Sequence, residues 1–157
     1  MRPMLRKIPV VREWFRHDIE PPRWEGEAGG HRILLEEEDS VLRRAMALAL
    51  REAGFQTAEC AGPGSHGEGR CPLVEGAGCH AVDEADAVIQ VLVPSDEAMN
   101  EVRTIIRSHN PDLPVTVIAP AATAARNPDL VAGTTVSSRP LSRQGVVDAA
   151  RAAVEQD

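Results

Sequence analysis

The sequence predicts an α/β fold in which five parallel strands form a doubly wound sheet with helices on both faces. Short apolar segments alternate five times with segments of helical periodicity, as expected for strands joined by crossover helices. The apolar segments are continuous runs, typical of parallel strands that are buried on both faces. Aromatic residues make up only 3% of the 157 residues, so the core must consist mainly of Val, Ile, Leu and Ala.

Residues 31–55 define this alternation most clearly. The apolar run at 33–35 predicts the first strand, and four acidic residues at 36–39 follow it. Ser40 is a good N-cap for the next helix, and Gly54 suits its C-terminal cap. The predicted buried stripe of this helix comprises Leu42, Ala45, Met46, Ala49, Leu50 and Ala53, and it leaves Arg43, Arg44, Ala47 and Arg51 outside.

The later elements repeat this pattern. Further strands are predicted at 55–60, 88–93, 114–119 and 134–139, and helices at 95–110, 121–132 (weak and interrupted by Asn127-Pro128) and 142–154. The predicted buried stripe of the helix at 95–110 comprises Met99, Val102, Ile105 and Ile106. Residues 61–84 are rich in glycine, so we expect a long loop there, with short turns near Leu73 and Ala81 at most.

Residues 1–30 are predicted to be an extension and linker ahead of a domain at 31–157. The first sixteen residues carry five basic side chains and one acidic one, together with Trp14 and Phe15. Aromatic and arginine side chains are typical of interfaces, so we expect Trp14 and Phe15 to dock on a protein partner or on a second copy of the chain. The alternatives are an extension that packs on its own domain or frays, and a short membrane-surface segment.

Composition excludes several classes of function. A net charge of −7 and an estimated pI of 5.2 argue against nucleic-acid binding, which requires a basic face. No apolar run is long enough to span a membrane and no signal-peptide core is present, so we expect a cytoplasmic protein without membrane contacts. Neither a phosphate-binding loop nor a Ser/His/Asp motif occurs, so we expect no enzymatic activity.

The acidic run after the first strand has a known counterpart. Residues 31–155 resemble a response-regulator receiver domain, in which paired acidic residues after the first strand hold a magnesium ion. The resemblance implies a flavodoxin-like sheet of strand order 2-1-3-4-5. It also implies a phosphoacceptor Asp at the end of the third strand, a Thr or Ser at the end of the fourth, and a Lys before a proline at the end of the fifth.

This chain departs from that pattern at most positions. The residues that fall on the receiver site are Glu37 and Glu38 for the acidic pair, Gln90 or Val91 for the acceptor, Ala119 for the hydroxyl residue and Arg139 for the lysine. Neither Gln90 nor Val91 can form an acyl phosphate. The resemblance therefore implies a degenerate pseudo-receiver that acts in signalling through protein–protein contacts.

Three expectations remain open at this site. Glu37 and Glu38 could bind a divalent cation such as Mg²⁺ weakly, because two carboxylates supply only part of an oxygen shell. Arg139 could lie across the acidic turn and pair with Glu37 or Glu38. An atypical phospho-receiver of a two-component system would need another acceptor, for which Asp86 is the candidate.

A second candidate site comprises Cys60, Cys71 and Cys79. Soft thiolates completed by His80, or by His66, could hold zinc or an iron–sulfur cluster, although the spacing is not that of a zinc knuckle. The alternatives are a Cys71–Cys79 disulfide that acts as a redox switch, and three ordinary reduced thiols. The sequence thus leaves a metal- or redox-responsive module as the alternative function.

Overall fold

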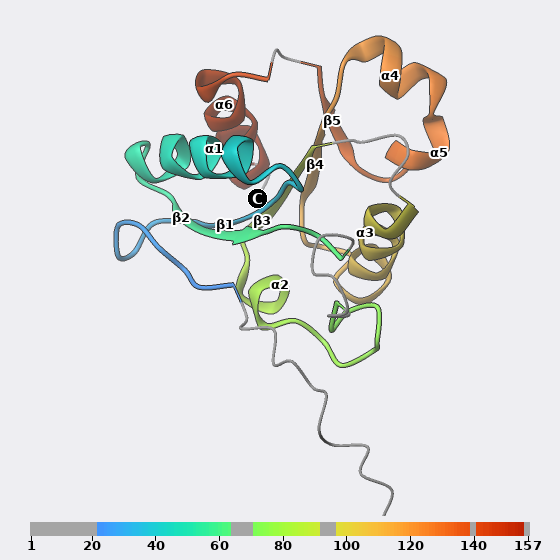
Figure 1. Ribbon diagram of the computed structural model, residues 1–157, viewed down its shortest axis with the longest axis horizontal. Coiled ribbons are helices and arrows are strands. Elements are labelled where there is room, and N and C mark those ends of the chain that lie inside the picture. Colours follow the sequence, from blue (N-terminus) through green and yellow to red (C-terminus); the bar gives the residue numbers. More distant parts are fainter. Residues whose placement is uncertain (1–21, 64–70, 92–96, 139–140, 156–157) are drawn as a thin grey trace, which may run out of the picture.

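The computed structural model describes residues 22–63, 71–91, 97–138 and 141–155. Its strands form one parallel sheet in the order β2-β1-β3-β4-β5, which confirms the predicted fold (Figure 1). The strands are β1 (Arg32–Glu36), β2 (Gln56–Cys60), β3 (Ala87–Val91), β4 (Val115–Ile118) and β5 (Thr135–Ser137).

Helices cover both faces of this sheet. They are α1 (Ser40–Glu52), α2 (His80–Glu84), α3 (Glu97–His109), α4 (Ala121–Arg126), α5 (Pro128–Val131) and α6 (Arg143–Val154). Helices α1 and α6 lie on one face, and α2 and α3 lie on the other (Figure 1). Asn127-Pro128 divides α4 from α5, as predicted, because proline lacks the amide hydrogen that a continuous helix requires.

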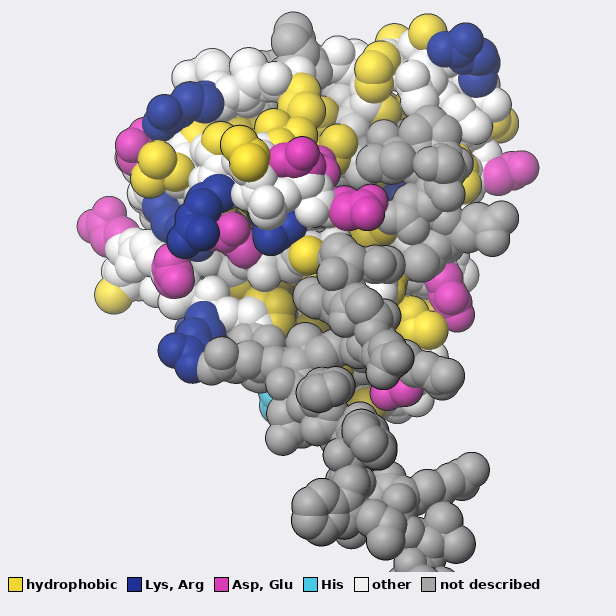
Figure 2. Space-filling view, viewed as in Figure 1, with side chains coloured by type: hydrophobic (Ala, Val, Ile, Leu, Met, Phe, Trp, Pro, Cys, Tyr) yellow, Lys and Arg dark blue, Asp and Glu magenta, His cyan; other side chains and the backbone are white. Residues whose placement is uncertain are grey.

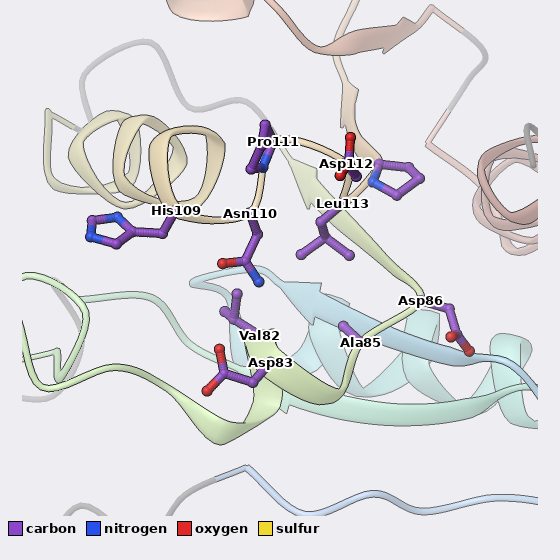
Figure 3. A pocket seen from close by; sticks show the side chains of 10 residues that line it. Val82, Asp83, Ala85, Asp86, His109, Asn110, Pro111, Asp112 and Leu113 are labelled. Atoms are coloured by element: carbon purple, nitrogen blue, oxygen red, sulfur yellow. The ribbon is translucent and has the colours of Figure 1, made fainter.

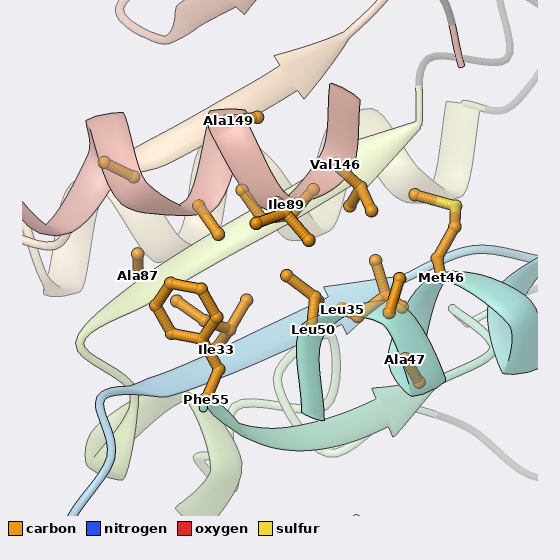
Figure 4. Close-up of a cluster of buried hydrophobic side chains, with 14 of the residues drawn as sticks. Ile33, Leu35, Met46, Ala47, Leu50, Phe55, Ala87, Ile89, Val146 and Ala149 are labelled. Carbon is orange, nitrogen blue, oxygen red and sulfur yellow. The ribbon is translucent and has the colours of Figure 1, made fainter. Parts of the chain in front are cut away.

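The core between the sheet and helices α1 and α6 is aliphatic (Figure 4). Alternate residues of the strands, such as Ile33 and Leu35, point into it and meet Leu50 and Val146 of the two helices. Helix α1 begins one residue earlier than predicted, because the side chain of Asp39, rather than that of Ser40, accepts the capping bond from the Leu42 amide. Gly54 follows α1 with a φ of 93°, as expected of a C-terminal glycine.

The buried stripe of α1 differs from the prediction. Ala47 is fully buried and Ala45 is exposed, the reverse of the predicted arrangement. Arg43 and Arg51, one turn on either side of Ala47, reach Glu59 of β2 at 3.7 and 3.0 Å. Because α1 packs on β2 along this side, the helix buries Ala47, which lies outside the stripe that periodicity predicts. The resulting mixture of positive and negative charges is visible over α1 and β2 in Figure 2.

The opposite face of the sheet has a second core. Leu34, Ala58 and Val88 meet Val82 of α2 and Ile106 of α3 there. The loop before α2 contributes partly buried side chains, including those of Cys71, Leu73, Val74 and Cys79. Turn hydrogen bonds join residues 71–77, and α2 occupies residues 80–84, so the two short turns predicted for this loop are present.

Residues 22–30 pack on the domain rather than forming a free linker. Glu25 exchanges backbone hydrogen bonds of 3.1 and 2.8 Å with Thr57, so this segment covers the outer edge of β2. Gly26 is required for that path, because its φ is 131° and a Cβ there would lie 2.3 Å from the carbonyl oxygen of Phe55. Trp24 packs against the second core, and its indole donates to Glu84 at 2.8 Å. Trp14 and Phe15 lie outside the described residues.

Candidate functional site

The carboxyl ends of β1 and β3 form the pole of the sheet where ligands of open parallel sheets bind. The register pairs Glu36 of β1 with Gln90 of β3, which places Val91 level with Glu37. Of the two candidates for the acceptor position, Val91 therefore lies beside the acidic residues that follow β1. Val91 is half-buried and carries no group that could accept a phosphoryl group.

Glu37 and Glu38 do not form a matched pair of exposed carboxylates. Glu37 is only 5% exposed, whereas Glu38 is exposed. The Glu37 carboxylate accepts a bond from the Asp39 amide at 2.9 Å through Oε1, and Oε2 is buried without a hydrogen-bond partner among the described residues. Burial raises the pKa of Glu37 above its ordinary value, and the bond from Asp39 lowers it in part. Weak Mg²⁺ binding at Glu37 and Glu38 remains a prediction.

A buried polar chain begins one residue earlier, at Glu36. Gln90 donates through Nε2 to the Glu36 carboxylate and accepts through Oε1 from Nε of Arg103 at 2.7 Å. Arg103 then donates to the carbonyl oxygen of Leu130 and, at 3.4 Å, to Oδ1 of Asn100. Glu36, Gln90 and Arg103 are each at most 2% exposed. This chain ties together β1, β3, α3 and α5.

The electrostatics of this buried polar chain centre on Glu36. Burial raises the pKa of Glu36 from 4.5 to about 7, although the bond from Gln90 and the charge of Arg103 both lower it. A buried carboxylate is costly unless hydrogen bonds and an opposite charge compensate it. Gln90 supplies the bond and Arg103 supplies the charge, with the amide of Gln90 placed between the two ions.

The sequence prediction missed Arg103. Among the side chains of α3 from Met99 onward, Met99, Val102, Arg103 and Ile106 are buried, while Ile105 is half-buried. These four follow the spacing i, i+3, i+4, i+7, which was the available signal. Arginine is rarely buried without a partner, and its partner Gln90 lies on a strand whose pairing the sequence does not display.

The cysteines lie beside this buried polar chain of Glu36, Gln90 and Arg103. Cys60 is paired in register with Glu36, so Cys60, Glu36 and Gln90 form a row across β2, β1 and β3. Cys71 and Cys79 pack against the same core, and all three cysteines are free thiols. Burial, with a smaller contribution from Glu36, raises the pKa of Cys60 to about 12, and burial also raises that of Cys71. Both shifts disfavour the reactive thiolate.

The structure does not bring the predicted ligands together among the described residues, and the metal site remains a prediction. Among the described residues, no three histidine, cysteine, aspartate or glutamate side chains are placed to hold one metal ion together. His80, the proposed fourth ligand, is exposed at the start of α2, and the alternative ligand His66 lies outside the described residues. The predicted Cys71–Cys79 disulfide is absent, because both are free thiols.

The remaining predicted positions are separated in space. Ala119 is buried directly after β4, and its amide donates to the carbonyl of Ser137 at 3.0 Å. Asp86 precedes β3, at the opposite end of the strand from Val91, and accepts a bond from the Arg32 amide at 2.7 Å. Asp86 is therefore remote from Glu37. Arg139 lies outside the described residues, so its pairing with Glu37 or Glu38 remains a prediction.

Comparisons with known proteins agree with the fold. No protein-family model matches the sequence, and no curated protein matches it either. A protein named for pilus assembly, CpaE from Burkholderia thailandensis, is 19% identical with a TM-score of 0.60, over 80% of this chain and 99% of that one. The chemotaxis response regulator CheY4 of Vibrio cholerae is 12% identical with a TM-score of 0.59, over 79% and 98%.

A response regulator receiver domain protein from Clostridium thermocellum is similar to the same extent. It is 13% identical with a TM-score of 0.60, over 80% of this chain and 95% of that one. Within the described parts of the chain, none of the helices is both long enough and apolar enough to span a lipid bilayer. The strand order and these likenesses together show that the chain has the fold of response-regulator receiver domains, built on a flavodoxin-like parallel sheet.

Proposed function

We propose that this chain is a non-catalytic pseudo-receiver that acts in signalling or regulation through protein–protein contacts. The observation that carries the proposal is the use of Gln90 as a bridge between Glu36 and Arg103. Phosphoryl transfer to a protein requires an ionised oxygen nucleophile held in line with the phosphoryl group. The strand end that should supply this nucleophile carries an amide engaged at both of its polar atoms, followed by Val91.

The buried chain gives the domain one fixed arrangement. The hydrogen bonds from Glu36 through Gln90 and Arg103 to the carbonyl of Leu130 connect the sheet to α3 and α5 through groups of the protein itself. A fully bonded network of this kind rigidifies the core that contains it. We therefore assign a constitutive binding role to the domain rather than a switch driven by phosphorylation.

The contact surface in this proposal is the last strand and the last helix. Val136 of β5 is 37% exposed, and Leu141, just before α6, is 44% exposed. Among the described strands, β5 is also an edge strand, since it pairs with β4 alone. Exposed apolar side chains beside an unpaired strand edge favour a protein partner or a second copy of the chain.

Site-specific photo-cross-linking tests these contacts. A photoreactive residue at Val136 or Leu141 should give one discrete adduct, with a partner protein or with the chain itself, in cells that express the chain natively. The matched control is Leu48, which is 48% exposed on α1. Adducts at Leu48 alone, or at none of the three positions, would contradict the assigned surface.

The alternative function is a metal- or redox-responsive module built on the same fold. The observation in its favour is that Cys60, Cys71 and Cys79 border one core and that Cys60 is paired in register with Glu36. Zinc or iron content per chain, with an absorption spectrum, tests this alternative on protein purified without oxygen. Stoichiometric metal that is lost in Cys71→Ser or Cys79→Ser would establish it, and metal-free protein with three titratable thiols would exclude it.

A further inference from the structure

A cleft opens at the pole of the sheet opposite Glu37. It has a volume of about 500 Å³ and is bounded by two walls that face each other (Figure 3). One wall comes from the end of α2 and the turn into β3, and the other from residues 109–114, which join α3 to β4. A second cavity of about 400 Å³ shares Val82, Asp83, His109 and Asn110 with it, so the two cavities adjoin.

The cleft is acidic. Asp83, Asp86 and Asp112 line it, and all three are exposed. Asp86 accepts a bond from the uncharged Arg32 amide and lies 3.5 Å from Nδ1 of His31. His109 is the only basic side chain among the residues that line the cleft, and no arginine or lysine of the described chain does so. Several carboxylates gathered on one open surface create a negative potential, which favours a cationic occupant.

The adjoining cavity supplies apolar surface. Leu73, Val82, Ile105 and Ile106 contribute to its lining, together with the glycines and alanine of residues 76–78. The two adjoining cavities thus offer carboxylates on both walls next to an apolar hollow. A segment that carries both arginines and large apolar side chains matches this combination.

The chain itself contains such a segment, covalently attached beside the cleft. Residues 2–16 carry five basic side chains, one acidic one and both Trp14 and Phe15. The described chain enters next to α2, where Trp24 donates to Glu84 and the Arg32 guanidinium lies 5.6 Å from the Trp24 ring. Glu84 immediately precedes the cleft residues Ala85 and Asp86. Eight residues from Arg16 to Trp24 can span up to about 26–29 Å when extended, which is ample to reach the cleft.

We propose that residues 2–16 dock into this acidic cleft of the same chain, with their basic side chains facing Asp83 and Asp112. Tethering makes the contact intramolecular, so weak individual charge interactions add up at a high effective concentration. The contact is screened by salt, because the facing carboxylates are exposed to solvent. It is independent of any chemistry at the opposite pole of the sheet.

The two tryptophans allow a direct test on the full chain. Incorporation of 5-fluorotryptophan gives two ¹⁹F resonances, which the Trp14→Phe variant assigns. Trp24 reports on the integrity of the fold and Trp14 on docking. In the Asp83→Asn/Asp112→Asn double variant, and in wild type at high salt, the Trp14 resonance should move to the position of a free peptide of residues 2–16, while the Trp24 resonance stays in place.

The matched control is the Asp129→Asn/Glu101→Gln double variant, which removes two negative charges at exposed positions outside the cleft. It should leave the Trp14 resonance unchanged. A Trp14 resonance that is already at the free-peptide position in wild type, or that does not respond to the cleft variant, would overturn the proposal. A wild-type Trp14 resonance that moves to the free-peptide position on dilution would show docking between two copies, and would overturn the intramolecular assignment.

A charge-reversal rescue makes the assignment specific. Arg12→Glu/Arg16→Glu should release the segment, and addition of Asp83→Arg/Asp112→Arg to that variant should restore docking. Release without rescue would show that the basic residues act elsewhere, which contradicts the cleft as their site.

Discussion

Glu36→Gln should remove most of the pH dependence of stability between pH 4.5 and 7. Burial raises the folded-state pKa of Glu36 to about 7 from 4.5, the value expected when the chain is unfolded. Between these values the folded protein holds a proton that the unfolded chain has lost. The free energy of unfolding therefore falls as the pH rises through this window.

The size of this effect follows from the same two values. One pKa unit corresponds to about 1.4 kcal/mol, so the shift of Glu36 amounts to about 3 kcal/mol of lost stability above pH 7. Glutamine at this position is neutral at every pH and keeps an oxygen that can accept the bond from Gln90. The variant should therefore be more stable than wild type at about pH 8, and close to it at about pH 5.

Urea unfolding at a series of pH values measures this difference directly. Glu38→Gln is the matched control, because Glu38 is exposed and lies two residues after Glu36. This variant should follow the wild-type curve. A smaller slope of the same sign should persist in Glu36→Gln, since burial also raises the pKa of Glu37. Parallel curves for wild type and Glu36→Gln would refute the reasoning that Glu36 is buried with a raised pKa.

Three further perturbations test other parts of the structure. Arg103→Met should lower the free energy of unfolding by about 3 kcal/mol, because it takes the donor away from the buried amide oxygen of Gln90 and the opposite charge away from the buried Glu36 carboxylate. Arg126→Met on the exposed face of α4 should change the free energy of unfolding little, and equal effects in urea unfolding would contradict the buried network. Gly26→Ala should lower the free energy of unfolding by about 1–3 kcal/mol, because position 26 has a positive φ and a Cβ there would clash with the backbone. Gly76→Ala should cost less, because position 76 has a positive φ but open space around it, and a lower melting temperature for Gly76→Ala than for Gly26→Ala would count against the bridge to β2. Burial raises the pKa of Cys60 to about 12 from an ordinary 9, so Cys60 should react with iodoacetamide about 10³-fold more slowly in the folded protein than in the unfolded chain. Peptide mass spectrometry measures the two rates, and equal rates would contradict the burial of Cys60.

The sequence was sufficient for the fold because its main signals are local. The apolar run at 33–35 and the helix that follows need only neighbouring residues for their interpretation, and both are present. Proline at 128 and glycine at 54 act on their own backbone, so the break between α4 and α5 and the end of α1 were also predictable.

The site was less predictable because its chemistry depends on pairs that are distant in sequence. The buried side chain of Glu36 is compensated by a hydrogen bond from Gln90, which is 54 residues away in the sequence. The buried side chain of Arg103 donates to the same glutamine. Ala47 is buried because β2 covers its side of α1, a tertiary effect that periodicity does not include. Glu25 pairs with Thr57 through backbone atoms alone, so its side chain gives no signal of the bridge.

The central claim is that the receiver fold of this chain carries no working phosphoacceptor, neither at the end of β3 nor at Asp86. Intact mass spectrometry after incubation with acetyl phosphate and Mg²⁺ tests it most directly, with Asp86→Ala as a companion variant. Our account predicts that the mass of the wild-type chain does not change. A gain of one phosphoryl group, whether or not Asp86→Ala abolishes it, would contradict the claim and make the chain an active receiver.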